Sequence, residues 1–272
     1  MRKLFFIACF FGVILCGKSQ SNLLSQSQGA RSHGMGSVRL NLPDSWSFFN
    51  NVGALDRIEN SQISVNYDSR FGLKELQTVS IAGAFKQNWG TLGIGLSRFG
   101  GKLFNQQTLG LGFSNQLGIV SFGLKAELFQ TNIEGFGTAS SVLVSFGGLA
   151  ELGPKLFLGA HVSNVNRGKI SRQSEERLPS AIQMGISYFP SNSLKLLIEL
   201  EKDLEVEPVL KTGIEYILKD LVSLRAGIKS KPGDLFFGIG ISPGKFIIDY
   251  AFGQNLALGS TNHLSLGIRW RE

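Results

Sequence analysis

The 272-residue sequence has little charge and little cysteine, and it has no apolar run long enough to cross a membrane as a helix. Charged residues make up 17% of the chain, against roughly 25% in an average soluble protein. Its two cysteines, Cys9 and Cys16, both lie near the start. The rest of the chain therefore has neither a disulfide framework nor thiolate chemistry. The apolar run from Leu4 to Leu15 is too short for a spanning helix, which needs about 20 residues.

The first residues have the form of a secretory signal. Arg2 and Lys3 precede the apolar run, as in the charged start of a signal peptide. We expect residues 1–19 to form this signal, with cleavage after Ser19. A lipid anchor on Cys16 is the less favoured alternative, because Leu15 stands where a lipidation motif needs a small residue.

The sequence also lacks the patterns of catalytic and cofactor sites. It has three histidines, His33, His161 and His263, and no Gly-x-Ser-x-Gly elbow, metal-ligand spacing or phosphate-binding loop. We therefore expect no catalytic residue, no metal, no cofactor and no enzymatic activity. The net charge of +7 is spread along the chain beside acidic residues, so we expect no nucleic-acid partner.

Strict alternation of apolar with small or polar residues fills most of the chain. In His263 to Trp270, Leu264, Leu266 and Ile268 fall on one face of an extended strand, because side chains alternate with period two. The same pattern recurs about fourteen times. The predicted strands are 59–70, 77–86, 89–98, 106–114, 119–129, 140–147, 155–163, 180–188, 194–201, 209–217, 221–229, 235–242, 245–252 and 263–270.

A transmembrane antiparallel β-barrel of about fourteen strands explains this pattern best. The alternative is a secreted soluble β-sandwich, whose outer face should be rich in charge. Here the face opposite the apolar one is largely Gly and Ser in several strands, and glycine reaches 34 residues in all. We therefore assign residues 61–272 to a barrel in the outer membrane of a Gram-negative bacterium, in contact with its lipid.

The connections support this assignment, since outer-membrane barrels have short periplasmic turns and longer external loops. With both barrel ends periplasmic, the links Thr131–Thr138, Asn164–Leu178 and Gly253–Asn262 are predicted to be external. The alternate links are tight, with one exception at Gly148–Pro154.

Residues 20–60 form neither a clean strand nor a long helix. Phe48, Val52 and Leu55 share one helical face, which predicts a short helix. We expect this segment to plug the barrel interior. The inward faces of the strands carry both signs of charge, which predicts a salt-bridged, plugged lumen because unpaired buried charge is costly. These residues are Lys125, Glu127, Lys195, Glu199, Glu201, Lys211, Glu215, Arg225, Lys229, Asp249 and Arg269.

Short motifs in the plug segment resemble those of a known family. They are Gly29-Ala30-Arg31, Gly34-Met35-Gly36, Asp44-Ser45-Trp46 followed by Phe49, and Asn51-Val52-Gly53-Ala54-Leu55. This stretch resembles the opening of FadL-type barrels and of the related PorV/PorQ group of Bacteroidetes-type bacteria. The resemblance implies a fourteen-stranded barrel with an N-terminal plug. The sequence departs from the family pattern at Val52, where the family has proline, and at Gly53-Ala54, where it has Ala-Gly.

The resemblance implies two classes of function. The compact size and small loops favour an accessory barrel for secretion or assembly, whose partners would be secreted or membrane proteins. The alternative is a transporter of hydrophobic small molecules. In that alternative the plug residues would shape the ligand path, and the candidates are Gly29, Arg31, Met35, Trp46, Phe48, Phe49 and Asn51.

Overall fold

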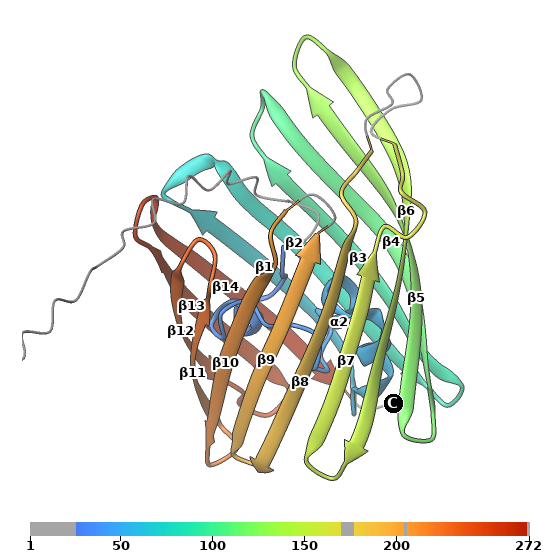
Figure 1. The fold of residues 1–272 in the computed structure, drawn as a ribbon, viewed down its shortest axis with the longest axis vertical. Helices are drawn as coiled ribbons and strands as arrows, with labels where there is room; N and C mark the ends of the chain where they lie inside the picture. Colours follow the sequence, from blue (N-terminus) through green and yellow to red (C-terminus); the bar gives the residue numbers. More distant parts are fainter. Residues whose placement is uncertain (1–25, 170–176, 204–205, 271–272) are drawn as a thin grey trace, which may run out of the picture.

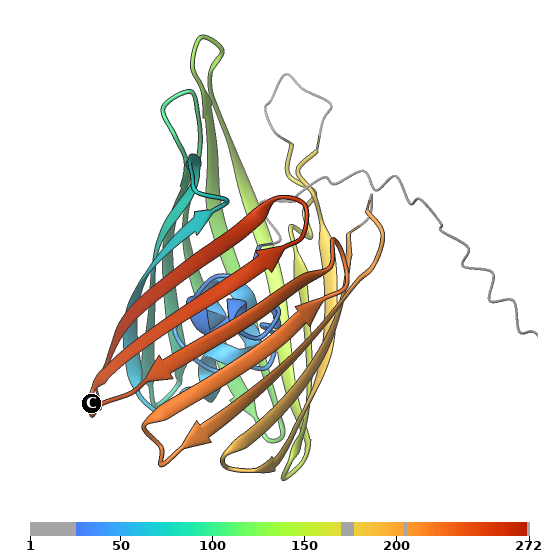
Figure 2. The same ribbon diagram turned by 90° about the vertical axis from the view of Figure 1, so that its left-hand side faces the viewer.

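The fold is a closed antiparallel β-barrel with the N-terminal segment folded inside it (Figures 1 and 2). The computed structural model describes residues 26–169, 177–203 and 206–270. The signal peptide expected in residues 1–19, with Cys9 and Cys16, lies outside the described residues. Within the described ranges, no helix is both long and apolar enough to cross a membrane.

Fourteen strands form the barrel, which confirms the predicted count and fold class. Each strand pairs with its neighbour in sequence, and β1 closes the sheet against β14 with Ser61 opposite Trp270. The strands are β1 (Ser61–Arg70), β2 (Leu73–Gln87), β3 (Gly90–Gly100), β4 (Phe104–Leu117), β5 (Val120–Ile133), β6 (Gly137–Gly153), β7 (Leu156–Ser163), β8 (Ala181–Ser191), β9 (Leu194–Asp203), β10 (Val209–Leu218), β11 (Val222–Lys229), β12 (Asp234–Ile241), β13 (Phe246–Asn255) and β14 (Gly259–Trp270).

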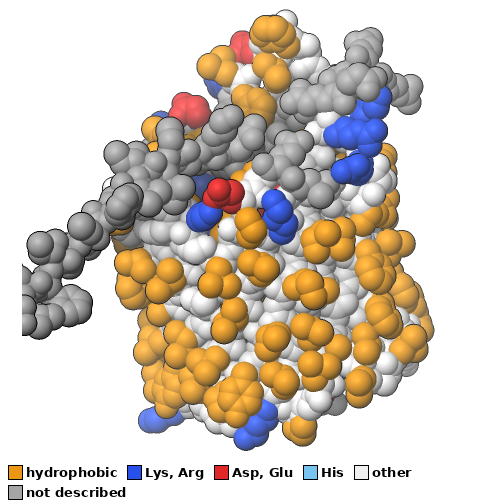
Figure 3. Space-filling view, in the orientation of Figure 1, with side chains coloured by type: hydrophobic (Ala, Val, Ile, Leu, Met, Phe, Trp, Pro, Cys, Tyr) orange, Lys and Arg blue, Asp and Glu red, His pale blue; other side chains and the backbone are white. Residues whose placement is uncertain are grey.

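The predicted apolar face is the outer surface of the barrel. Leu124 and Ile198 are 55% and 57% exposed, whereas the inward-facing Ser121 and Gln183 are buried. Figure 3 shows apolar side chains over the visible face of the wall, with Lys and Arg near its margins. An apolar outer belt on a closed barrel is what lipid requires, since closure leaves no backbone edge unpaired. The protein is therefore an outer-membrane barrel.

The connections differ from the expectation at the external end. The β5–β6 and β13–β14 links, expected as loops, are short turns at 134–136 and 256–258, because their strands continue further than the apolar pattern does. At the periplasmic end β6 runs to Gly153, so the predicted exception at Gly148–Pro154 becomes a tight turn. The β7–β8 link is long, as expected, and its residues 170–176 lie outside the described part of the chain.

The plug consists of three short helices inside the barrel, α1 (Ala30–His33), α2 (Ser47–Asn50) and the 3-10 helix η2 (Val52–Arg57). They are the blue segments enclosed by the wall in Figure 2. Phe48, Val52 and Leu55 lie in one fully buried cluster, as predicted. They do not share one helix, because the extended Asn51 separates α2, which carries Phe48, from η2, which carries the other two. The wall must be glycine where the plug approaches it most closely. A β-carbon on Gly95 would lie 2.2 Å from the Phe48 ring, and one on Gly227 would lie 2.1 Å from the Met35 carbonyl carbon.

A charge on the lipid-facing belt should impair membrane assembly. Leu124→Arg places a cation near the middle of the apolar belt and should cost roughly 2–4 kcal/mol. Gln130→Arg is the matched control, because Gln130 lies on the same face of β5 beyond the apolar residues. The measurement is the folded fraction recovered in lipid bilayers. Equal recovery for both variants would contradict the assignment of the belt.

Candidate functional site: the plugged lumen

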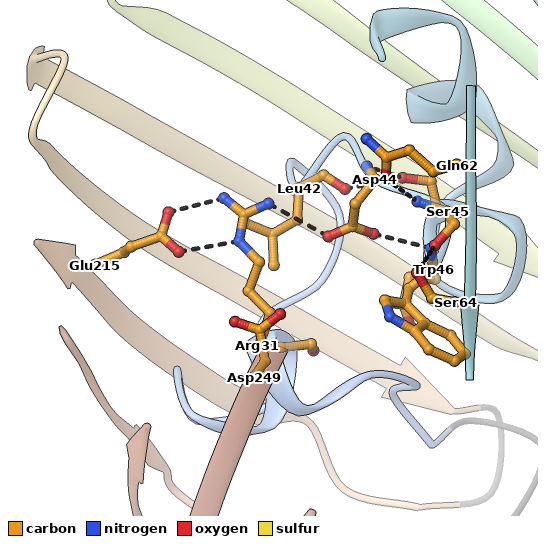
Figure 4. Close-up of polar contacts among 12 residues, drawn as sticks. Arg31, Leu42, Asp44, Ser45, Trp46, Gln62, Ser64, Glu215 and Asp249 are labelled. Atoms are coloured by element: carbon orange, nitrogen blue, oxygen red, sulfur yellow. Dashed lines mark hydrogen bonds and ion pairs between the residues drawn. The ribbon is translucent and has the colours of Figure 1, made fainter. Parts of the chain in front are cut away.

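Glu215 on β10 is the centre of a charge cluster that holds the plug to the wall. Its side chain is 1% exposed and contacts three cations. Arg31 of the plug lies 2.8 Å from Oε2, Arg225 lies 2.7 Å from Oε1, and Lys195 lies 3.0 Å from Oε2. Arg31 also pairs with Asp44 of the plug at 3.3 Å (Figure 4). Its guanidinium therefore links two parts of the plug to each other and to the wall.

A second cluster ties Arg39 of the plug to β9 and β10. The Arg39 backbone N–H donates to Glu199 Oε2 at 2.8 Å, and its guanidinium lies 3.2 Å from Glu201. Lys211 bridges the same two carboxylates, at 3.3 Å from Glu199 and 2.6 Å from Glu201. Further pairs are Arg225–Asp249 at 2.6 Å and Lys125–Glu127 at 3.0 Å.

These pairs make a salt-bridged lumen around the plug. Burying these charges is tolerable because each of them has a partner of opposite sign. Arg269, also expected in the lumen, lies outside these clusters. It occupies an inward register position on β14, but its guanidinium donates to the carbonyl of Gly244 at a periplasmic turn.

The seven plug residues expected along a ligand path have mainly packing contacts. Gly29 lies against the Trp46 ring, and Met35 packs with Val38, Leu42 and Leu197. Asn51 donates to the carbonyls of Leu40 and Gly148, which fixes the entry to η2. Phe48 fills the glycine-lined wall, and Arg31 belongs to the charge cluster of Glu215. Phe49 is the one of the seven that lines the cavity described below.

Sequence reasoning missed a further contact that holds the plug to the wall. His33 of α1, Asp68 of β1 and His263 of β14 form it. The two imidazole rings stack with centroids 3.7 Å apart, and His263 Nδ1 lies 2.6 Å from Asp68 Oδ1. His33 Nε2 faces Asp68 Oδ2 at 3.8 Å. The register of β1 with β14 places Asp68 opposite His263, and the sequence alone does not give that register.

The His33–Asp68–His263 group is close enough to ligate a metal, since its ligand atoms lie within 4.8 Å of one another. The stacking argues against it. Imidazole binds a metal in its ring plane, and two nearly parallel rings have no shared in-plane position. Arg70 and Lys229 also lie near enough to act electrostatically on His33, and they disfavour a further cation. The group is an anchor of the plug.

Burial shifts the pKa of two plug residues. Burial raises the pKa of Asp44 to about 6, although Arg31 opposes this shift. Burial and the neighbouring His263 lower the pKa of His33 well below its ordinary value, although Asp68 opposes this shift. His33 is therefore neutral at neutral pH.

A cavity of about 80 Å³ lies on the external side of the plug. Its walls come from the external halves of β2 to β8, from the plug and from the start and end of the β7–β8 link. That link turns inward, because Leu178 packs with Phe129 and Leu143. The lining residues are Gln26, Gln28, Arg39, Phe49, Thr78, Ser97, Phe99, Gln106, Thr108, Lys125, Glu127, Phe129, Leu143, Ser145, His161, Ser163, Asn164, Pro179 and Gln183.

A closed fourteen-stranded barrel with an internal N-terminal plug defines the class of this protein as a FadL-type outer-membrane barrel fold. Solved structures that share the fold include the CymD monoaromatic hydrocarbon channel (12% identity, TM-score 0.71, 92% of this chain and 99% of that chain), the P. putida toluene transporter TodX (12%, 0.70, 91% and 100%) and a Pseudomonas aeruginosa FadL homologue (12%, 0.60, 89% and 98%).

No protein-family model matches the sequence, and no curated protein matches it. At this level of identity the likeness shows the fold alone. It agrees with the FadL-type resemblance of the plug motifs.

Removing the central carboxylate should loosen the plug. Glu215→Gln leaves Arg31, Arg225 and Lys195 without their shared anion, and breaking such a buried pair costs about 3–5 kcal/mol. The variant should lose its folded band at a lower temperature in a heat-modifiability gel. Glu134→Gln, on the exposed β5–β6 turn, is the control and should behave as the wild type. An unchanged Glu215→Gln variant would mean that the cluster does not hold the plug.

Acidification should weaken the anchor at His33. The unfolded chain binds a proton at His33 below its ordinary pKa of 6.5, whereas the buried ring resists protonation. Stability is therefore full above that value and falls as the pH drops below it, by at most about 1.4 kcal/mol per pH unit for one proton.

The readout for this effect is thermal stability at about pH 7.5 and about pH 5, where the ordinary imidazole is neutral and charged respectively. His33→Phe keeps a ring on His263 but cannot titrate, so its stability should fall less than that of the wild type. Carboxylates outside this cluster titrate in both proteins, so their contributions cancel in the comparison. An equal fall in both would contradict the role of His33.

Proposed function

We propose that this protein is a channel that admits small hydrophobic molecules through the outer membrane, with the plug closing the lumen at rest. The observation that carries the proposal is the external cavity, which stands directly above a plug inside a FadL-type barrel. Two proteins of the same fold are described as a monoaromatic hydrocarbon channel and a toluene transporter, which supports the same class of cargo.

The contacts of the plug hold it on both sides of the lumen. On the β9–β13 side ion pairs fix its resting position. On the β3–β6 side Phe48 and Val52 pack against glycines. Asp56 also accepts from Thr91 of β3, and Arg57 pairs with Glu151 of β6 at 3.2 Å. A shift of the plug would therefore have to break directional bonds on both sides. A ligand held by Phe49 in the cavity would then have a route toward the periplasm.

The alternative function is an accessory barrel for secretion or assembly of the PorV type. The tightly packed, ion-paired lumen favours it, since a barrel that passes nothing needs no free path. The fold likeness to hydrocarbon channels supports transport better. The PorV/PorQ resemblance rests on the plug motifs alone, and so does the assignment to Bacteroidetes-type bacteria.

Locking the plug to the wall tests the channel directly. The hydroxyl groups of Ser45 on the plug and Ser64 on β1 lie 2.8 Å apart, and both are buried (Figure 4). This contact makes the two positions suited to a cysteine pair. The Ser45→Cys/Ser64→Cys variant should admit a labelled aromatic compound at the wild-type rate when reduced, and at least about tenfold more slowly when oxidised, because the plug must shift.

The same protein after reduction is the matched control, and the Ser45→Cys single variant controls for oxidation itself. The measurement is uptake by cells that produce the barrel, compared with cells that carry an empty vector. Uptake equal to the vector control in every state would reject the transport function. Uptake that persists after oxidation would reject a moving plug.

A further inference from the structure

The external cavity has a size that fits one aromatic ring. A cavity needs roughly 10–15 Å³ to hold one water molecule. About 80 Å³ therefore holds on the order of five to eight water-sized positions. A benzene ring with one or two small substituents, seven or about eight non-hydrogen atoms in all, fits this space, whereas a long acyl chain is too large for it.

Aromatic side chains from three elements supply an apolar part of the lining. Phe49 comes from α2, Phe99 from β3 and Phe129 from β5. Phe129 is backed by Leu143 and by Leu178 of the β7–β8 link. Such surfaces suit a planar ring, because aromatic pairs gain about 0.5–1.5 kcal/mol beyond area burial.

The rest of the lining is polar, and part of it lacks partners. Thr78 is 2% exposed, and its hydroxyl has no hydrogen-bond partner among the described residues. Glu127 uses Oε2 for Lys125, and no described residue donates to its Oε1. A hydrocarbon in this cavity would leave both groups unsatisfied. A ligand hydroxyl could accept from Thr78 or donate to Glu127.

The cations of the lining are already engaged, which argues against an anionic ligand. Lys125 pairs with Glu127, donates to the Phe49 carbonyl at 3.2 Å and lies 5.2 Å from the Phe48 ring centroid. Arg39 contacts Glu199 and Glu201. A buried carboxylate on the ligand would have to compete for these cations beside Glu127, at a desolvation cost of several kcal/mol.

We propose that the cavity selects small aromatic compounds that carry a hydroxyl group, phenol being the simplest, over aromatic hydrocarbons and aromatic acids of similar size. The proposal rests on the channel function above and names the class of compound that this channel admits. Thr78 is its specificity-determining residue, because a site that hydrogen-bonds a ligand hydroxyl discriminates against the analogue that lacks it.

Two fluorinated probes of equal size, one with a hydroxyl and one with a methyl group, test the selectivity together with a slightly larger aromatic acid. 4-Fluorophenol, 4-fluorotoluene and 4-fluorobenzoate are titrated against the full barrel in lipid nanodiscs, and binding is followed by fluorine NMR. The fluorophenol should bind at least about tenfold more tightly than either other probe, which is the size of effect expected when polar groups are left unpaired. Equal affinities, or tighter binding of the toluene or the benzoate, would overturn the proposal.

Variants show where the probe binds. Thr108→Phe fills the cavity and should abolish saturable binding, whereas Leu109→Phe, on the lipid face of the same strand, should leave it unchanged. Thr78→Val keeps the shape of the side chain and removes its hydroxyl. It should weaken fluorophenol several-fold and leave fluorotoluene unaffected. Fluorophenol binding that survives Thr108→Phe would overturn the assignment to this cavity.

The two proposals fail separately. Uptake of aromatic hydrocarbons with no preference for the phenol would overturn this inference and leave the channel function standing. The absence of both saturable binding and uptake above the vector control would reject the channel function itself.

Discussion

Every charge inside this barrel needs a partner, and that requirement organises the lumen. A closed sheet in lipid satisfies its own backbone, but its inward side chains must be satisfied by one another or by what fills the interior. Here the filling is the start of the same chain. Arg31 and Arg39 of the plug pair with carboxylates of the wall, and each of these carboxylates contacts more than one cation. Glu215 contacts three. The plug is thus a structural component of the barrel as well as the segment that closes its lumen.

The plug meets the wall through two kinds of contact. Ion pairs and hydrogen bonds are directional and specify one position, from Arg31 and Arg39 toward β9–β13 and from Asp56 and Arg57 toward β3–β6. Glycines of β3–β6 also admit Phe48 and Val52 at short range. The directional bonds therefore define where the plug sits, and the glycines define how tightly the lumen is filled. The polar cavity remains above these contacts because the plug does not reach the external half of the lumen.

Alternation with period two was enough to predict the strands, their count and the lipid face, because each of these follows from the local pattern within one strand. It was also enough to predict that Glu215 and Arg225 face inward. Their partners could not be predicted, since Arg31 lies far from both in sequence. The ends of β5 and β6 were missed because strand pairing continues above the lipid, where apolar alternation stops. The cavity depends on how Phe49, Phe129 and Leu178 meet in space, and no local pattern encodes that.

The unequal heights of the strands have a consequence for approach from outside. β6 has 17 residues and β12 has 8, so the wall rises on one side and is low on the other (Figures 1 and 2). At about 3.3 Å per residue the difference in strand length is on the order of 30 Å, which a strand tilt of about 35–45° reduces to roughly 20–25 Å in height. The barrel mouth is therefore an oblique opening that faces sideways. Molecules moving along the cell surface would enter over the shorter strands and meet the longer strands on the opposite side of the opening.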